Sequence, residues 1–424
     1  MTDRRFKAVP WSYNTNIYEV NLRQYTDIGS FESFGKHLPR LRDMGVEILW
    51  FMPITPISYE KRLGTLGSYY ACSSYVDTNP EYGTIEDFRN LVAKAHELGF
   101  KVIIDWVANH TGWDHEWTKS NPGFYKRNPE GSFYDSHGWE DVIDLNYYDH
   151  ELRREMVKAM RFWVEDCNID GFRCDMAHLV PLDFWRNTRE ELDAIRPLFW
   201  LAETDDANYF EVFDTGYAWD WMHRTEKSFK GKVPLEEVVN TLMKYRNEYP
   251  VGSRHAYFTT NHDENSWNGT EYEKYGESVK GLAVFSYTWN GVPLVYSGQE
   301  LPNHRRLKFF EKDHIDWNEE PRLHGFYKTL NDFRKSHPVF DSYPSIEPIL
   351  VYTPHSQKSL CYFARKDDFY VLVILNFSAE HLSFDLSAQQ FNGTFKSLLD
   401  ERSIDFSTTA QIEIEPWDCL VLHK

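Results

Sequence analysis

Hydrophobic residues in the first 335 positions follow two alternating patterns. Short runs rich in β-branched and aromatic residues, such as residues 46–51 and 101–107, predict buried strands. Between these runs, apolar residues recur every three or four positions, which predicts amphipathic helices. Thr84 and Asp87 begin one of these helices with the pattern of a capping box. Regular alternation of strands and helices indicates a parallel sheet covered by its helices.

This alternation repeats eight times, and its sixth strand has the weakest hydrophobic pattern. Eight strand–helix units in a chain of this length are typical of a closed (β/α)8 TIM barrel. The predicted strands are residues 17–22, 46–51, 101–107, 171–175, 199–202, 217–219, 255–260 and 292–296. The predicted helices are residues 31–44, 84–98, 151–166, 182–194, 235–245, 275–287 and 323–335.

Two regions depart from the alternation. Residues 111–148 are polar and aromatic without helical spacing, which predicts a short inserted subdomain over one end of the barrel. Residues 338–424 contain short strands separated by turn residues, which predicts an antiparallel β-sandwich. The barrel is then formed by residues 1–110 and 149–337. The predicted sandwich strands are residues 349–352, 360–364, 369–377, 394–398 and 419–422.

The net charge of −19 narrows the class of partner. Nucleic acids and anionic membranes are bound through basic patches, so we expect neither as a partner. The aromatic content of 17% supplies flat apolar faces with polar edges, which suit a neutral sugar. No apolar run approaches the ~20 residues that cross a bilayer.

Cysteine usage and the N-terminal residues bear on the compartment. The five cysteines form no C-x-x-C pair, and their odd number favours reduced thiols. The first residues are polar and lack the apolar core of a signal peptide. We therefore expect a cytoplasmic protein.

Chemically active side chains gather where the predicted strands end, the catalytic face of a parallel barrel. Arg173 and Asp175 lie on one side of the strand at residues 171–175. Such an arginine is expected to hold the carboxylate ionised, with a low pKa. Glu203 follows the fifth strand and Asp263 follows the seventh. These carboxylates are expected to converge on one mouth.

Two chemistries suit these side chains. Two carboxylates, one as nucleophile and one as acid/base, cleave glycosidic bonds. The absence of H-x-H and H-E-x-x-H spacings, and the repulsion between Arg173 and any cation, make glycoside cleavage the simpler expectation. The rival is a metal-dependent hydrolase whose ligands are drawn from His110, His262, Asp175, Glu203 and Asp263.

Short motifs at these positions give a family resemblance. In chain order they are GSYY at 67–70, NPEYGT at 79–84, DWVANH at 105–110, DLN at 144–146, GFRCD at 171–175, Glu203, NHD at 261–263 and YSGQE at 296–300. The ordered set resembles the α-amylase family of retaining glycoside hydrolases, glycoside hydrolase family 13. The resemblance covers about residues 12–335, and the predicted sandwich is similar to the family's C-terminal domain.

The resemblance implies catalytic roles for three carboxylates. Asp175 is the expected nucleophile. Glu203, with a raised pKa, is the expected acid that protonates the leaving oxygen and then the base that activates water. Asp263 is expected to bind the 2- and 3-hydroxyls of the distorted sugar. The other implied substrate contacts are Tyr70, His110, Arg173, His178 and His262.

Some positions carry further expectations. Tyr70, rather than Tyr69, is the expected sugar platform, because it lies twelve residues before Tyr82. His178 stands where many family members have a lysine, so the resemblance leaves specificity on the leaving-group side open. Trp113, Trp117 and Trp139 could be further platforms, but packing within the insert is the simpler expectation.

A structural calcium ion is frequent in the family. Its ligands in this chain would be Asn109, Asp144 and the backbone carbonyl of Leu179, oxygen donors of the kind Ca²⁺ prefers. Calcium-free relatives keep similar residues, so the motif leaves calcium binding open. No cofactor is needed for the chemistry itself.

The expected function is hydrolysis, with retention, of α-1,4-glucosidic bonds in a neutral α-glucan such as malto-oligosaccharides or starch fragments. The same scaffold also serves α-1,6-glucosidases, cyclodextrin and maltogenic hydrolases, and transglycosylases such as trehalose synthase and glucanotransferase. A different class is a non-catalytic glycan-binding protein, which would be expected to lack one of Asp175, Glu203 and Asp263.

Overall fold

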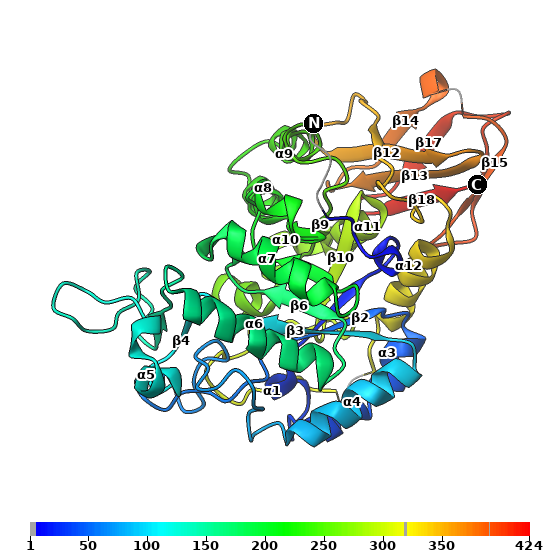
Figure 1. The fold of residues 1–424 in the computed structure, drawn as a ribbon. Coiled ribbons are helices and arrows are strands. Elements are labelled where there is room, and N and C mark those ends of the chain that lie inside the picture. The colour runs from blue at the N-terminus through cyan, green and yellow to red at the C-terminus, as the bar shows by residue number, and fades with distance from the viewer. Residues whose placement is uncertain (1–5, 318–319, 390) are drawn as a thin grey trace.

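A computed structural model describes residues 6–317, 320–389 and 391–424. Eight parallel strands close into a barrel in the order β1-β10-β9-β8-β7-β6-β3-β2, which confirms the predicted TIM barrel (Figure 1). The barrel strands are β1 (Ile17–Val20), β2 (Ile48–Phe51), β3 (Lys101–Trp106), β6 (Gly171–Cys174), β7 (Phe199–Ala202), β8 (Thr215–Tyr217), β9 (His255–Tyr257) and β10 (Gly291–Tyr296).

Helices surround the barrel, and several of the predicted bounds are wrong. The helix predicted at residues 31–44 is split, because Pro39 lies in the first turn of a second helix. Gly276, with φ +54°, separates two helices where one was predicted at 275–287. Trp219 begins a helix rather than ending the sixth strand. The longer helices are α4 (Ile85–Glu97), α6 (His150–Glu165), α7 (Leu182–Asp193), α8 (Trp219–Phe229), α9 (Leu235–Glu248), α11 (Val279–Thr288) and α12 (His324–Ser336). The shorter ones are α1 (Leu22–Tyr25), α2 (Phe31–Gly35), α3 (Leu38–Asp43) and α10 (Glu271–Tyr275).

The segment after β3 projects from one side of the barrel (Figure 1). Its base is a two-stranded antiparallel sheet of β4 (His110–Gly112) and β5 (Val142–Asp144). It also contains the short helix α5 (Trp117–Ser120), although the sequence shows no helical spacing there. The sheet returns the chain to the barrel, so residues near β5 lie beside the carboxyl end of β3.

The C-terminal residues form two antiparallel sheets, as expected. Buried side chains of β13 and β18 pack against those of β14 and β17 in one hydrophobic core, which makes the pair a sandwich. The structure adds β14, β16 and β17 to the predicted strands. One sheet has the order β11 (Ile349–Leu350), β12 (Ser359–Lys366), β13 (Phe369–Asn376), β18 (Cys419–His423), β15 (Thr394–Ser397), β16 (Ser403–Asp405), and the other pairs β14 (Leu382–Asp385) with β17 (Gln411–Ile414).

The sandwich joins the barrel through a shared apolar layer. Val371 and Val373, on the opposite face of β13, belong to the same hydrophobic core as α11. Within the described ranges, none of the helices combines the length and hydrophobicity needed to cross a bilayer.

Candidate active site

Arg173 is the centre of the charged cluster at the barrel mouth. Its side chain is fully buried, and its Nη1 lies 2.8 Å from Asp105 Oδ1 and 2.8 Å from Asp175 Oδ1. Its Nη2 forms an ion pair of 3.0 Å with Glu203 Oε2. The predicted pairing of Arg173 with Asp175 is therefore present. The structure extends it, because one guanidinium serves three carboxylates.

The register of neighbouring strands brings these side chains together. Asp105 on β3 is the pairing partner of Arg173 on β6. Asp175 and Glu203 each follow directly after a strand, β6 and β7 respectively. The amide of Glu203 donates to the carbonyl of Cys174, so the two acids lie at the same height on adjacent strands. β6 and β7 approach closely at Gly171, where a Cβ atom would lie 2.0 Å from the Phe199 carbonyl oxygen. Only glycine permits this approach.

Met176 supports Glu203 through an unusual backbone conformation. Its φ of +40° lies in the left-handed region, which costs a residue with a side chain on the order of 1 kcal/mol. In this conformation its amide donates to Glu203 Oε2 at 2.9 Å. The carboxyl of Glu203 is thus fixed from two sides, by Met176 and Arg173.

Burial dominates the ionisation of the two facing acids. It raises the pKa of Glu203 to about 7, although Arg173 opposes the shift. It also raises the pKa of Asp175 to about 6, again against Arg173 and with help from the Asp105 charge. The predicted raised pKa of Glu203 is confirmed. The prediction of a low pKa for Asp175 is wrong for the free site, because Arg173 is shared among three acids and does not offset burial.

A second set of contacts surrounds His262. The Tyr70 hydroxyl lies 2.8 Å from His262 Nε2 and donates to Asp105 Oδ2 at 3.1 Å. The same nitrogen lies 3.1 Å from Asp263 Oδ2. Although burial opposes it, the His262 charge lowers the pKa of Asp263. Asp263 is therefore held ionised, as a carboxylate that accepts hydroxyl hydrogen bonds must be.

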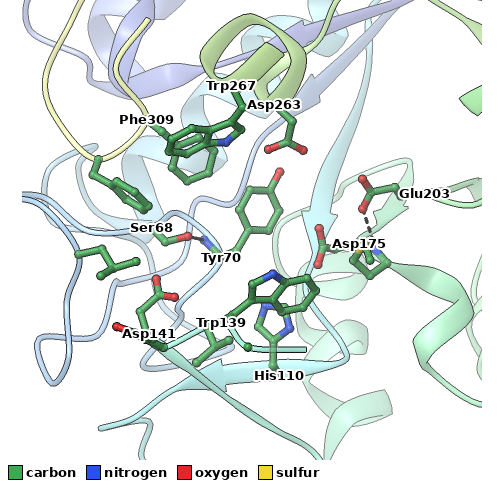
Figure 2. A pocket seen from close by; sticks show the side chains of 16 residues that line it. Ser68, Tyr70, His110, Trp139, Asp141, Asp175, Glu203, Asp263, Trp267 and Phe309 are labelled. Carbon is green, nitrogen blue, oxygen red and sulfur yellow. Dashed lines mark hydrogen bonds between the residues drawn. The ribbon is translucent and has the colours of Figure 1, made fainter. Parts of the chain in front are cut away.

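These residues open onto a cavity of about 450 Å³ at the barrel mouth, within the usual range for ligand sites. Figure 2 shows Tyr70 at its centre, with Asp175 and Glu203 on one side and Asp263 above. His110 also lines it. The cavity thus collects Tyr70, His110, Asp175, Glu203 and Asp263 from five segments of the chain, with Arg173 and His262 buried behind them.

Aromatic side chains form two walls of the cavity, and of these Trp267 and Phe309 were not singled out from the sequence. Trp139, on the insert, packs against His137 as expected, and it also lines the cavity at 36% exposure. Opposite it, Trp267 lies 5.4 Å from Phe309 between ring centroids (Figure 2). Asp141, beside Trp139, also lines the cavity. Trp117, by contrast, is buried as expected.

His178 does not line the cavity. It belongs to a single 3-10 turn, Ala177–Leu179, and its side chain is exposed. Its backbone carbonyl accepts a hydrogen bond from the Tyr209 hydroxyl. The turn after Met176 carries the side chain away from the acids, which sequence spacing alone does not reveal.

Two of the predicted calcium ligands, Asp144 and Asn109, already have other partners. The carboxylate of Asp144 pairs with Lys126 Nζ at 2.9 Å and also accepts from the Ser136 hydroxyl. The Asn109 amide lies 3.2 Å from His110 Nδ1. No cluster of three or more His, Cys, Asp or Glu side chains suited to a metal occurs in the described part of the chain. Lys126 would repel a divalent ion bound to Asp144, which argues against the predicted calcium site.

The chain is similar to known proteins in both sequence and fold. The family model for the α-amylase catalytic domain matches residues 22–137 and 125–212. The crystal structure of a noncanonic maltogenic α-amylase, AmyB from Thermotoga neapolitana, superposes with a TM-score of 0.89 and 32% identity, covering 97% of this chain and 99% of that one. The chain belongs to the α-amylase family. Its fold is that of the family's glycoside hydrolases.

Other α-amylase relatives are more distant or longer. An α-amylase from Lactobacillus plantarum superposes with a TM-score of 0.88 at 27% identity, covering 97% of this chain and 99% of that one. α-Amylase 3 of Dictyoglomus thermophilum is 27% identical over 350 residues, which are 69% of this chain and 65% of that protein. The chain thus spans just under two thirds of that relative. Other relatives are named oligo-1,6-glucosidase and maltosyltransferase, so family membership leaves the bond open.

Proposed function

We propose that this α-amylase-family enzyme hydrolyses α-1,4-glucosidic bonds in malto-oligosaccharides and starch fragments, with retention of anomeric configuration. The observation that carries the proposal is the single buried arginine shared by Asp175 and Glu203 at the wall of an aromatic-lined cavity. Two carboxyls held on adjacent strands can act on opposite sides of one glycosidic bond. The cavity offers apolar faces for a neutral ring and acceptors for its hydroxyls.

In the first step Asp175 attacks the anomeric carbon while Glu203 gives its proton to the leaving glycosidic oxygen. The C–O bond to the leaving sugar breaks and an ester bond to Asp175 forms, so charge and atoms balance. In the second step Glu203 takes a proton from water, whose oxygen displaces Asp175 from the same carbon. Two inversions restore the α configuration.

Substrate binding is assigned to the groups around this pair. Asp263, held ionised by His262, accepts hydrogen bonds from two ring hydroxyls. Tyr70 presents its ring to the cavity and His110 a further hydrogen-bonding group. Trp139 and Trp267, on opposite walls, provide surfaces for neighbouring sugar rings. His178 is left out of this assignment because it lies outside the cavity.

Lys126 takes the structural place of calcium in this proposal. Its ammonium neutralises Asp144 at the base of the insert, next to the cavity. Neither hydrolysis nor the fold is then expected to need Ca²⁺.

A panel of sugars tests the proposed bond. Maltoheptaose, isomaltotriose and a cyclodextrin are incubated separately with the enzyme and the products separated by chromatography. Cleavage of maltoheptaose into shorter malto-oligosaccharides supports the proposal. Exclusive cleavage of isomaltotriose would assign an α-1,6 specificity, and products longer than maltoheptaose would assign transfer to a second sugar.

A further inference from the structure

A carboxylate lies directly behind the sugar-binding residues, on the opposite side from the cavity. Glu19 is on β1, and its side chain is fully buried inside the barrel. Its Oε1 accepts from His262 Nδ1 at 2.5 Å and from the His262 backbone amide at 3.3 Å. Among the described residues its Oε2 has no hydrogen-bond partner. The hydrogen bonds that the Glu19 side chain makes are therefore both to His262.

His262 faces carboxylates from both of its nitrogens. Nδ1 meets Glu19, and Nε2 meets Asp263 Oδ2 at 3.1 Å and the Tyr70 hydroxyl at 2.8 Å. Neutral imidazole has only one N–H, so in that form one ring nitrogen would direct a lone pair at a carboxylate. The imidazolium donates from both. The contacts therefore select the charged, two-donor form of His262.

We propose that Glu19 is a positioning residue, which keeps His262 in this two-donor form so that Nε2–H holds Asp263 and Tyr70 in place for the sugar. The inference rests on the proposed function, since it assigns Asp263 and Tyr70 to substrate. Glu19 itself does not line the cavity at the barrel mouth. It acts through His262, as carboxylates behind histidines do at other sites.

The charges around His262 are consistent with this role. The ionisable groups that interact with His262 directly are Glu19 (β1), Tyr70 (after β2), Asp105 (β3) and Asp263 (after β9). Arg173 (β6), Tyr217 (β8) and Tyr296 (β10) belong to the same charged cluster through their interactions with Glu19. Arg173 is the cation among them and disfavours a second positive charge. Although burial also opposes it, Asp263 and Glu19 raise the pKa of His262 well above its usual value.

The first test reads the proton and needs no substrate. In wild-type protein at pH 8, ¹⁵N-edited NMR is expected to show both ring protons of His262, with the Nδ1 proton at low field. The signals are assigned by their loss in His262→Gln. In Glu19→Gln one of the two ring protons is expected to be lost at pH 8, whereas Glu19→Asp keeps both. A neutral His262 in wild type at pH 8, or an unchanged spectrum in Glu19→Gln, would overturn the proposal.

The second test measures the effect of Glu19 on catalysis. With maltoheptaose, Glu19→Gln is expected to lower kcat/KM on the order of 10- to 100-fold at pH 8, the size found for carboxylates that orient metal-binding histidines. The loss is expected to be smaller at pH 6, where His262 regains its proton. The matched control is Glu300→Gln, another fully buried carboxylate, whose partners Tyr18 and Arg40 lie outside the cavity. It should leave the pH profile unchanged.

The two tests separate this inference from the function beneath it. A wild-type enzyme that leaves maltoheptaose intact would remove the proposed function, while a Glu19-dependent imidazolium would still establish the pairing. Wild-type cleavage with equal losses at pH 6 and pH 8 in Glu19→Gln would remove the positioning role alone. If Glu19→Gln does not fold, the spectra of the wild type and of Glu19→Asp show whether His262 carries both ring protons at pH 8. A neutral His262 in either protein would overturn the proposal.

Discussion

Arg173 and Lys126 each neutralise carboxylates near the carboxyl end of β3, but with opposite results. Arg173 is fully buried and shared by Asp105, Asp175 and Glu203. Lys126 is 38% exposed and pairs with Asp144. Although burial opposes it, hydrogen bonds from Ser136 and Lys126 lower the pKa of Asp144, whereas burial raises the pKa of Glu203 to about 7.

The difference lies in the supply of positive charge. At the barrel mouth one cation is shared by three buried acids, so it cannot neutralise all of them. The acids therefore retain protons at higher pH and titrate near neutral pH. At Asp144 one cation, hydroxyl and amide donors, and the neighbouring Asp135 side chain, whose own pKa burial raises, together keep the carboxylate ionised. The first arrangement suits proton transfer and the second suits structure.

Removing the nucleophile should have the largest effect. Asp175→Asn cannot form the glycosyl ester, so kcat for maltoheptaose is expected to fall by at least about 10³-fold. The fold should persist, because a buried negative charge is lost. Reducing-sugar release measures kcat, and thermal melting measures the stability of the fold. Asp183→Asn, an exposed aspartate paired with Arg153 outside the cavity, is the control and should keep full activity. Full activity in Asp175→Asn would refute the assignment.

Removing the shared cation should cost stability as well as activity. Arg173→Met leaves three acids without the cation they share, and breaking buried ion pairs in this way costs about 3–5 kcal/mol. Denaturant unfolding at pH 8, where the acids are ionised, should show this loss, and a smaller loss is expected at pH 5, where the acids take up protons. Equal stability of the variant and the wild type at pH 8 would mean that the acids do not depend on Arg173.

The pH dependence follows from the two facing acids. Activity requires Asp175 ionised and Glu203 protonated. Because their pKa values are about 6 and about 7, kcat/KM should rise as pH increases through about 6 and fall as it increases through about 7. Initial rates from pH 4 to 9 at constant ionic strength measure the profile. A rate that stays flat above pH 7 would exclude Glu203 as the acid.

The smallest effect is expected at the second cation. Lys126→Met should destabilise the fold by about 1–2 kcal/mol, less than a fully buried pair, because solvent screens the exposed ammonium. kcat should change less than about twofold, since no catalytic group touches Lys126. Melting of the wild type should be unaffected by EDTA or CaCl₂. A calcium-dependent rise in melting temperature would show that a metal, not Lys126, serves Asp144.

Strand ends explain why much of the site could be predicted. Hydrophobic runs locate the barrel strands, and barrel topology then brings Asp175, Glu203 and Asp263 to one face without knowledge of any loop. The position of Asp105 follows in the same way, because its place on β3 makes it the neighbour of Arg173. The three predicted acids therefore follow from pattern and topology together.

Loop residues could not be placed in this way. Trp139 and Trp267 reach the cavity because the insert folds back on β5 and because a π-helix (Glu264–Asn268) follows Asp263. His178 leaves the cavity because of the turn that follows Met176. These paths depend on contacts between distant segments. The same holds for the ionisation of Asp175, which depends on how many acids share Arg173.

The most direct test of the account is the anomeric form of the first product. Wild-type enzyme is mixed with maltoheptaose, and ¹H NMR records the new reducing end before mutarotation. A covalent intermediate on Asp175 predicts that the α-anomer appears first. A β-anomer as first product would contradict the account, because it requires direct attack by water and leaves Asp175 no role as nucleophile.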